Sequence, residues 1–130
     1  MKKYYLVTVI LALLMVILTA CGSSGSPTNE DAPLIDIKIE TNPDPAVVGD
    51  VELILTVTGL EGKPIEDAKV DVSADHIDMS GMTMDGPATE QGDGKYAIKA
   101  DFSMSGNWEI TVYVRKGELD ESLKIPVIIK

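Results

Sequence analysis

The chain is poor in the residue types from which most catalytic and metal sites are built. Its 130 residues include one cysteine, one histidine and one tryptophan. A single cysteine cannot form an intrachain disulfide or a thiolate cluster for a metal. The sequence also lacks a nucleophile elbow, a phosphate-binding loop and a zinc signature. We therefore expect a protein that is not an enzyme.

Basic residues are scarce as well. The chain has 11 Lys and Arg against 21 Asp and Glu, which gives a formal net charge of −10. A negative field of this size repels the phosphates of nucleic acids and anionic lipid headgroups. We expect no nucleic-acid partner, and any attachment to a membrane must come from something other than charge.

One long apolar run stands at the N-terminus. Two lysines precede the segment from Tyr4 to Leu18, which is shorter than the roughly 20 residues that a membrane-spanning helix needs. The tetrapeptide Leu-Thr-Ala-Cys that ends at Cys21 is similar to a bacterial lipobox. The pattern predicts a removable signal peptide over residues 1–20 and a diacylglycerol on the Cys21 thiol. Two acyl chains anchor a protein stably, so we expect a lipid-anchored protein on the extracytoplasmic face of the cell membrane.

The remainder of the chain divides into two parts. Residues 21–33 are rich in Gly, Ser and Pro and carry almost no side chain that could join a core, which is typical of a flexible tether. Residues 34–130 have the length of one domain. We expect a lipid-anchored tether followed by a single folded unit.

Apolar and polar residues alternate with period two through most of this domain, which favours half-buried β-strands. Turns rich in Gly, Pro, Asn and Asp separate the runs about every ten residues. The predicted fold is all-β, an immunoglobulin-like antiparallel sandwich of six or seven strands. Pro126 lacks an N–H and predicts an edge position for the last strand. The expected strands are 35–40, 51–58, 68–74, 95–102, 108–114 and 123–129, with a seventh candidate in 77–85.

The segment from residue 75 to residue 86 differs in composition from the rest of the domain. It contains Met79, Met82 and Met84, and His76 stands just before them. If 68–74, 95–101 and 108–115 are strands C, E and F of the sandwich, the C–D and E–F connections lie at one end of it. Met104, in the second connection, is then expected to approach the other three methionines.

Thioethers are neutral, soft ligands, and a group of them with an imidazole suits Cu(I) and suits hard cations badly. The predicted ligands are Met79, Met82, Met84, Met104 and His76. Methionine also fills irregular gaps, so Ile77, Met79 and Met84 could instead plug the end of the sandwich, and that alternative stays open. Trp108 could cover a cuprous ion with its ring face, but its place in an inward-facing row favours core packing.

Two further alternatives use the same region. Exposed methionines can form an adaptable contact surface for a membrane-bound partner protein. Loop carboxylates can also supply hard oxygen ligands to Ca²⁺, although their spacing here matches no EF-hand loop. The acidic residues concerned are Asp75, Asp78, Asp85, Glu90 and Asp93.

The stretch from Val70 to Val114 resembles the YtkA-like domain, a relative of FixH-like proteins. The resemblance rests on the Met-rich hairpin, on Gly94-Lys95-Tyr96 and on the run Phe102-Ser-Met-Ser-Gly-Asn-Trp-Glu-Ile-Thr-Val112. It implies an immunoglobulin-like sandwich outside a bacterial membrane, often a lipoprotein. It also implies an association with copper or heavy-metal handling, or with assembly of copper-containing respiratory oxidases.

In this resemblance, the family's Met-rich turn falls on Met79, Met82 and Met84, and its Met-x-Gly-x-Trp motif begins at Met104. The chain departs from the commoner Met-Pro-x-Met form, because Ser80-Gly81 replaces the proline and His76 precedes the methionines instead of following them. We expect a Cu(I)-binding lipoprotein that serves a copper protein or a membrane complex. The alternative is a non-catalytic interaction or structural module of the cell envelope.

Overall fold

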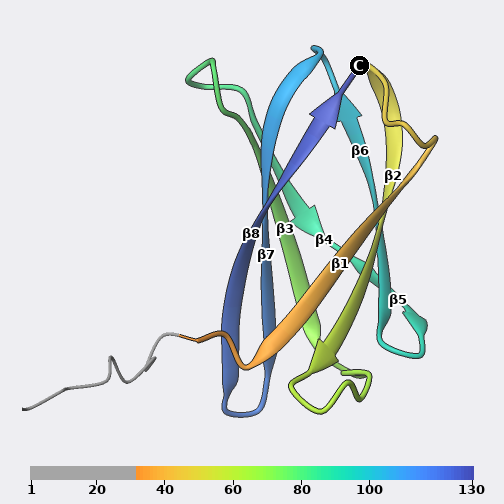
Figure 1. Ribbon diagram of the computed structural model, residues 1–130, viewed down its shortest axis with the longest axis vertical. Coiled ribbons are helices and arrows are strands. Elements are labelled where there is room, and N and C mark those ends of the chain that lie inside the picture. Colours follow the sequence, from red (N-terminus) through yellow and green to blue (C-terminus); the bar gives the residue numbers. More distant parts are fainter. Residues whose placement is uncertain (1–31) are drawn as a thin grey trace, which may run out of the picture. The chain divides into compact units, whose positions relative to one another are not determined.

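Eight β-strands make up the regular secondary structure of residues 32–130, the part of the chain that the computed structural model describes. They form two four-stranded antiparallel sheets, with strand orders β1-β2-β6-β5 and β4-β3-β7-β8 (Figure 1). This is the strand order of an immunoglobulin-like sandwich, so the predicted fold class is confirmed. The strands are β1 (Ile35–Asn42), β2 (Gly49–Gly59), β3 (Lys69–His76), β4 (Thr83–Pro87), β5 (Thr89–Gly92), β6 (Lys95–Phe102), β7 (Gly106–Lys116) and β8 (Leu119–Ile129).

The predicted signal peptide, the lipid site at Cys21 and nearly all of the tether lie outside the described residues and stay predictions. The compact unit that follows runs from Pro33 to Lys130. Residues 32–130 contain no helix long and apolar enough to cross a membrane.

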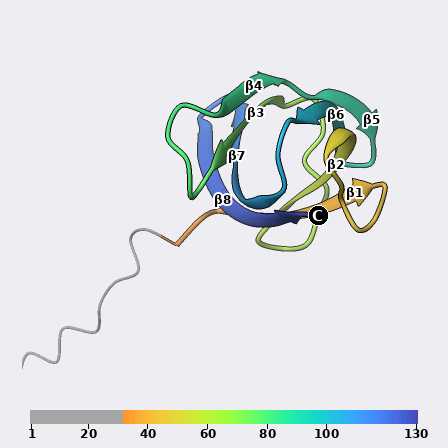
Figure 2. The same ribbon diagram turned by 90° about the horizontal axis from the view of Figure 1, so that it is seen from above.

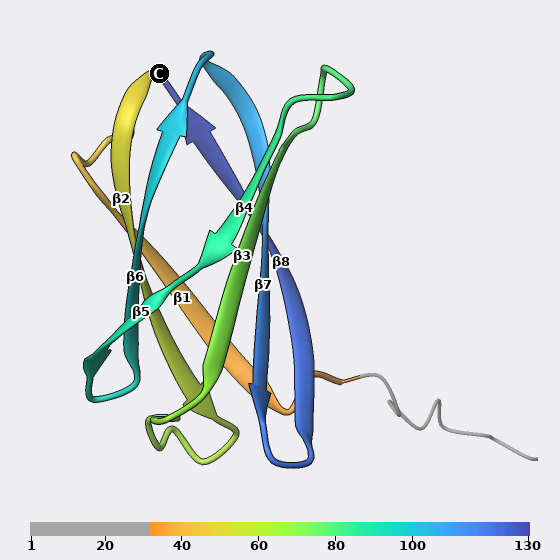
Figure 3. The ribbon, with the colours of Figure 1, turned by 180° about the vertical axis from the view of Figure 1, so that it is seen from behind.

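The chain changes sheets between β4 and β5. These strands are separated only by Ala88, yet β4 pairs with β3 and β5 pairs with β6 (Figure 3). The strand expected in 77–85 is therefore shifted, since residues 77–82 form the turn and β4 continues to Pro87. β5 is an additional strand, and the sequence did not signal it because none of its four residues is buried.

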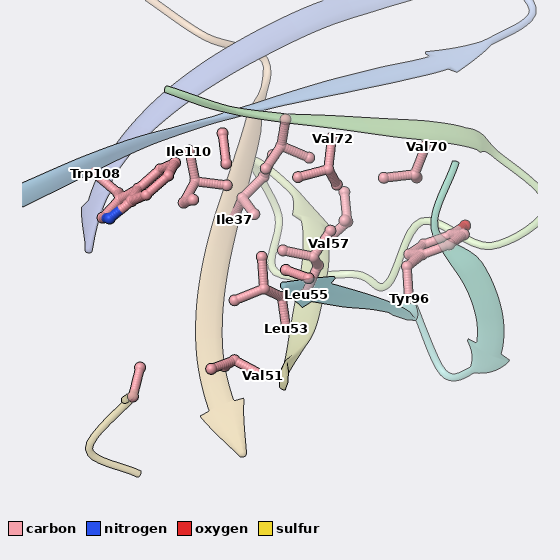
Figure 4. Packing of buried hydrophobic residues seen from close by; sticks show 14 of the residues in the cluster. Ile37, Val51, Leu53, Leu55, Val57, Val70, Val72, Tyr96, Trp108 and Ile110 are labelled. Atoms are coloured by element: carbon pink, nitrogen blue, oxygen red, sulfur yellow. The ribbon is translucent and has the colours of Figure 1, made fainter. Parts of the chain in front are cut away.

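The two sheets face each other (Figure 2), and their side chains meet in one hydrophobic core (Figure 4). In β2, buried apolar residues alternate with more exposed residues as the sequence predicts. The buried residues are at most 1% exposed, and they are Val51, Leu53, Leu55 and Val57. Burying one such side chain stabilises the fold by roughly 1.5–3 kcal/mol. β8 lies at the edge of its sheet, where the missing N–H of Pro126 is tolerated, so the edge prediction is confirmed.

The two ends of the sandwich differ. Ile35 pairs with Gly59 at the end where the chain enters, whereas Gly49 pairs with Phe102 at the other end. The β3–β4 and β6–β7 connections lie together at this second end (Figure 1), because His76 pairs with Trp108. The predicted proximity of the two connections is confirmed.

Tyr96 closes the core at the end where the chain enters, far from Trp108 (Figure 4). Its hydroxyl donates to the carbonyl oxygen of Ile65 at 2.9 Å and accepts from the amide of Ala68 at 3.1 Å. The phenol thereby fixes the connection between β2 and β3. Burial raises the pKa of Tyr96 above its ordinary value of 10.0.

We expect Tyr96→Phe to destabilise the domain by about 1–3 kcal/mol, because it leaves two backbone groups without their partner. The parent should also lose stability as pH rises through the raised pKa of Tyr96, because the folded state disfavours the ionised phenol. Urea unfolding at neutral and alkaline pH measures both effects. An unchanged difference between variant and parent across that pH range would contradict this role for Tyr96.

Candidate functional site

The β3–β4 hairpin is held by backbone hydrogen bonds on both sides. The amide of His76 donates to the carbonyl oxygen of Met82 at 3.1 Å, and that of Met79 donates to the carbonyl oxygen of His76 at 3.4 Å. The amide of Ile77 donates across to Asn107 in β7 at 2.9 Å. The turn that carries the methionines is therefore tied to the sheet.

Met82 directly precedes β4 and Met84 lies in it. Both are partly buried against the core, and Met84 pairs with the fully buried Ala74. Together with Trp108 they line a pocket of about 250 Å³. The other residues of this Met82–Met84 pocket are Gly81, Thr83, Asp101 and Ser103.

The other two methionines lie elsewhere. Met79 is 44% exposed, and neither Met79 nor Met104 lines the Met82–Met84 pocket. The carbonyl oxygen of Met104 accepts the indole N–H of Trp108 at 3.2 Å. The structure thus brings together two of the four predicted sulfur ligands. Of the three residues that the packing alternative named, Met84 packs against the core, whereas Ile77 and Met79, at 57% and 44% exposed, do not plug the end of the sandwich. Met82 also packs against the core.

His76 is only 8% exposed, and both of its ring nitrogens have backbone partners. Nδ1 accepts from the amide of Asp78 at 3.2 Å, so the proton of the neutral ring is on Nε2, which donates to the carbonyl oxygen of Ser105 at 3.2 Å. The ring links the β3–β4 turn to the β6–β7 turn. To bind a metal, His76 would have to give up one of these bonds.

Gly106 makes the close approach of His76 feasible. Its φ angle is +136°, and a Cβ added there would lie 2.6 Å from Nε2 of His76. Only a residue without a side chain fits this backbone beside the imidazole. Gly106 therefore matters for the position of the ring.

Trp108 is 2% exposed, which confirms the prediction of core packing. The structure adds that it also lines the Met82–Met84 pocket. The sequence did not predict Asp101 and Ser103 as residues of this pocket, because nothing in the neighbouring sequence indicates that the end of β6 faces β4. The expected position of the β3–β4 and β6–β7 connections at one end of the sandwich was the indirect indication.

The acidic residues of the described chain form no cluster comparable to the methionine pair of the pocket. Across residues 32–130, no three His, Cys, Asp or Glu side chains are grouped so that they could hold a metal ion. The calcium alternative therefore receives no support from the described part of the chain. The soft side chains of the Met82–Met84 pocket are the donors that the fold brings together.

Comparison with known proteins identifies the family of the chain. The family model described as YtkA-like matches residues 31–113, more than half of the chain, and this stretch includes the hairpin and Trp108. No curated protein and no solved structure matches the chain. The expected relation to FixH-like proteins stays a prediction. The chain belongs to the YtkA-like family.

Proposed function

We propose that this protein is a lipid-anchored, extracytoplasmic Cu(I)-binding protein that acts in copper handling or in the assembly of respiratory oxidases. Met82 and Met84 supply the sulfur ligands. The observation that supports this proposal is that two half-buried methionines, Met82 and Met84, line one pocket of about 250 Å³. The proposed role is the binding and delivery of copper, not catalysis. The net negative charge of the chain disfavours binding to nucleic acid.

The donor set fits copper in its reduced state. Two neutral sulfurs and a single nearby carboxylate, that of Asp101, suit a soft monovalent ion and offer little to Ca²⁺ or Mg²⁺. Because His76 uses both ring nitrogens, we assign it to positioning the two turns instead of binding copper. Met79 and Met104, outside the pocket, become ligands only if the turns rearrange around the ion.

The place of the pocket in the fold suits delivery to a partner. The described chain enters the sandwich at Ile35, at the end opposite the Met82–Met84 pocket (Figure 1). The entry of the chain therefore does not cover the pocket, which stays open to a copper protein or a membrane complex.

An interaction module remains the second candidate. Ile77 and Ile128 are 57% and 64% exposed and flank Asn107 on either side of β7. Met79, in the turn of the same hairpin, is 44% exposed. Exposed apolar side chains that adjoin one another mark contact sites for partner proteins, and this role requires no bound metal.

The test is an anaerobic Cu(I) titration of the intact protein in detergent against a chromophoric chelator. We expect saturable binding of one Cu(I) per chain, which excess Ca²⁺ or Zn²⁺ does not displace. Failure to compete with a weak chelator would refute the copper function and favour the interaction module.

A further inference from the structure

The Met82–Met84 pocket has a buried side and an exposed side. Trp108 is 2% exposed, and Met82 and Met84 are half-buried. The remaining lining residues, Gly81, Thr83, Asp101 and Ser103, are all exposed. Trp108 therefore lies at the inner end of the pocket, and the polar residues form its rim.

Three contacts hold the indole ring in place. Its N–H donates to the carbonyl oxygen of Met104, and the rings of Phe102 and His76 each form a T-shaped contact with it, at 5.0 Å between centroids and 75° between planes. A side chain held on several sides cannot swing away to make room for a ligand. An ion that entered between the two sulfurs would meet the indole.

The charge of such an ion has to be balanced inside the pocket. Thioethers are neutral, and Asp101 stands on the exposed rim, where water screens it. The face of an indole attracts cations, more strongly than that of any other side chain, and the attraction grows when water is excluded. The buried inner end of the pocket meets this condition.

We propose that Trp108 forms the third side of the copper site, its indole face contacting an ion that Met82 and Met84 hold. The inference rests on the proposed copper function. Two sulfurs and a ring suit the low coordination number and softness of monovalent Cu⁺ and Ag⁺. They do not replace the hydration of a divalent ion, which calls for several nitrogen or oxygen ligands. The site would then select soft monovalent ions.

The test uses Ag⁺, which avoids the redox chemistry of copper, with the intact protein in detergent. Affinity is measured by calorimetry for the parent and for Trp108→Phe, Trp108→Leu and Tyr96→Phe. Tyr96→Phe is the matched control, because Tyr96 is a buried ring at the other end of the core and does not line the pocket (Figure 4). Circular dichroism confirms that each variant is folded before its affinity is compared.

We expect affinity to fall in the order Trp, Phe, Leu at position 108, by on the order of tenfold in total, and to stay close to the parent value in Tyr96→Phe. Ag⁺ should also quench the emission of the parent, whose single tryptophan is Trp108. Unchanged affinity in Trp108→Leu, or an equal loss in Tyr96→Phe, would overturn the role of the indole and leave the sulfur site standing. No Ag⁺ or Cu⁺ binding by the parent would overturn the copper function as well.

Discussion

Replacing Met82 and Met84 together by leucine is expected to weaken Cu(I) binding by about 100-fold or more while the domain stays folded. Leucine nearly keeps the volume of methionine, so each substitution should cost less than about 1.5 kcal/mol of stability. It offers no soft donor, so both proposed ligands are lost. Chelator competition measures the affinity, and thermal unfolding measures the stability.

The chain provides a matched control for this experiment. Met79 lies in the β3–β4 turn and Met104 in the β6–β7 turn, and neither lines the pocket. The double variant Met79→Leu/Met104→Leu therefore makes the same chemical change outside the pocket. It should bind Cu(I) almost as the parent does. If this control lost the ion and the Met82/Met84 variant kept it, copper would bind at the outer methionines and the pocket would be the wrong site.

Gly106→Ala is expected to cost about 3 kcal/mol or more, a large share of the 5–15 kcal/mol that stabilises a typical domain. Two penalties add up. The φ angle of +136° disfavours any residue with a Cβ, and that Cβ would lie 2.6 Å from Nε2 of His76. For a domain of this size the loss should lower the melting temperature by roughly 15 °C.

A second glycine separates the two penalties. Gly49 has a φ angle of +108° and no atom within 4 Å of an added Cβ. Gly49→Ala should therefore lose only the stability that the unfavourable backbone conformation costs. Removing the imidazole by His76→Ala should in turn lessen the cost of Gly106→Ala, a coupling that a double-mutant cycle measures. Equal costs for the two alanine variants would show that contact with His76 contributes nothing.

Most of the strand pattern was predictable because it is local. The alternation of Val70, Val72 and Ala74 in β3 depends only on which side chains are apolar, and the structure buries all three. The structure continues that alternation two residues beyond the predicted end of the strand at Ala74, and His76 is buried as well. The single interior proline of the last strand was sufficient to place that strand at an edge.

The composition and order of the residues by themselves determined an all-β sandwich with a Met-rich hairpin at one end and made the lone cysteine a predicted anchor. Only the tertiary structure decided which methionines share a pocket. Met82 and Met84 belong to the inward face where the chain enters β4, whereas Met79 lies in a turn where no period governs side-chain direction. Asp101, Ser103 and Trp108 join them because the two sheets bring β6 and β7 beside that hairpin, a contact between residues too far apart in the chain for any local pattern to encode.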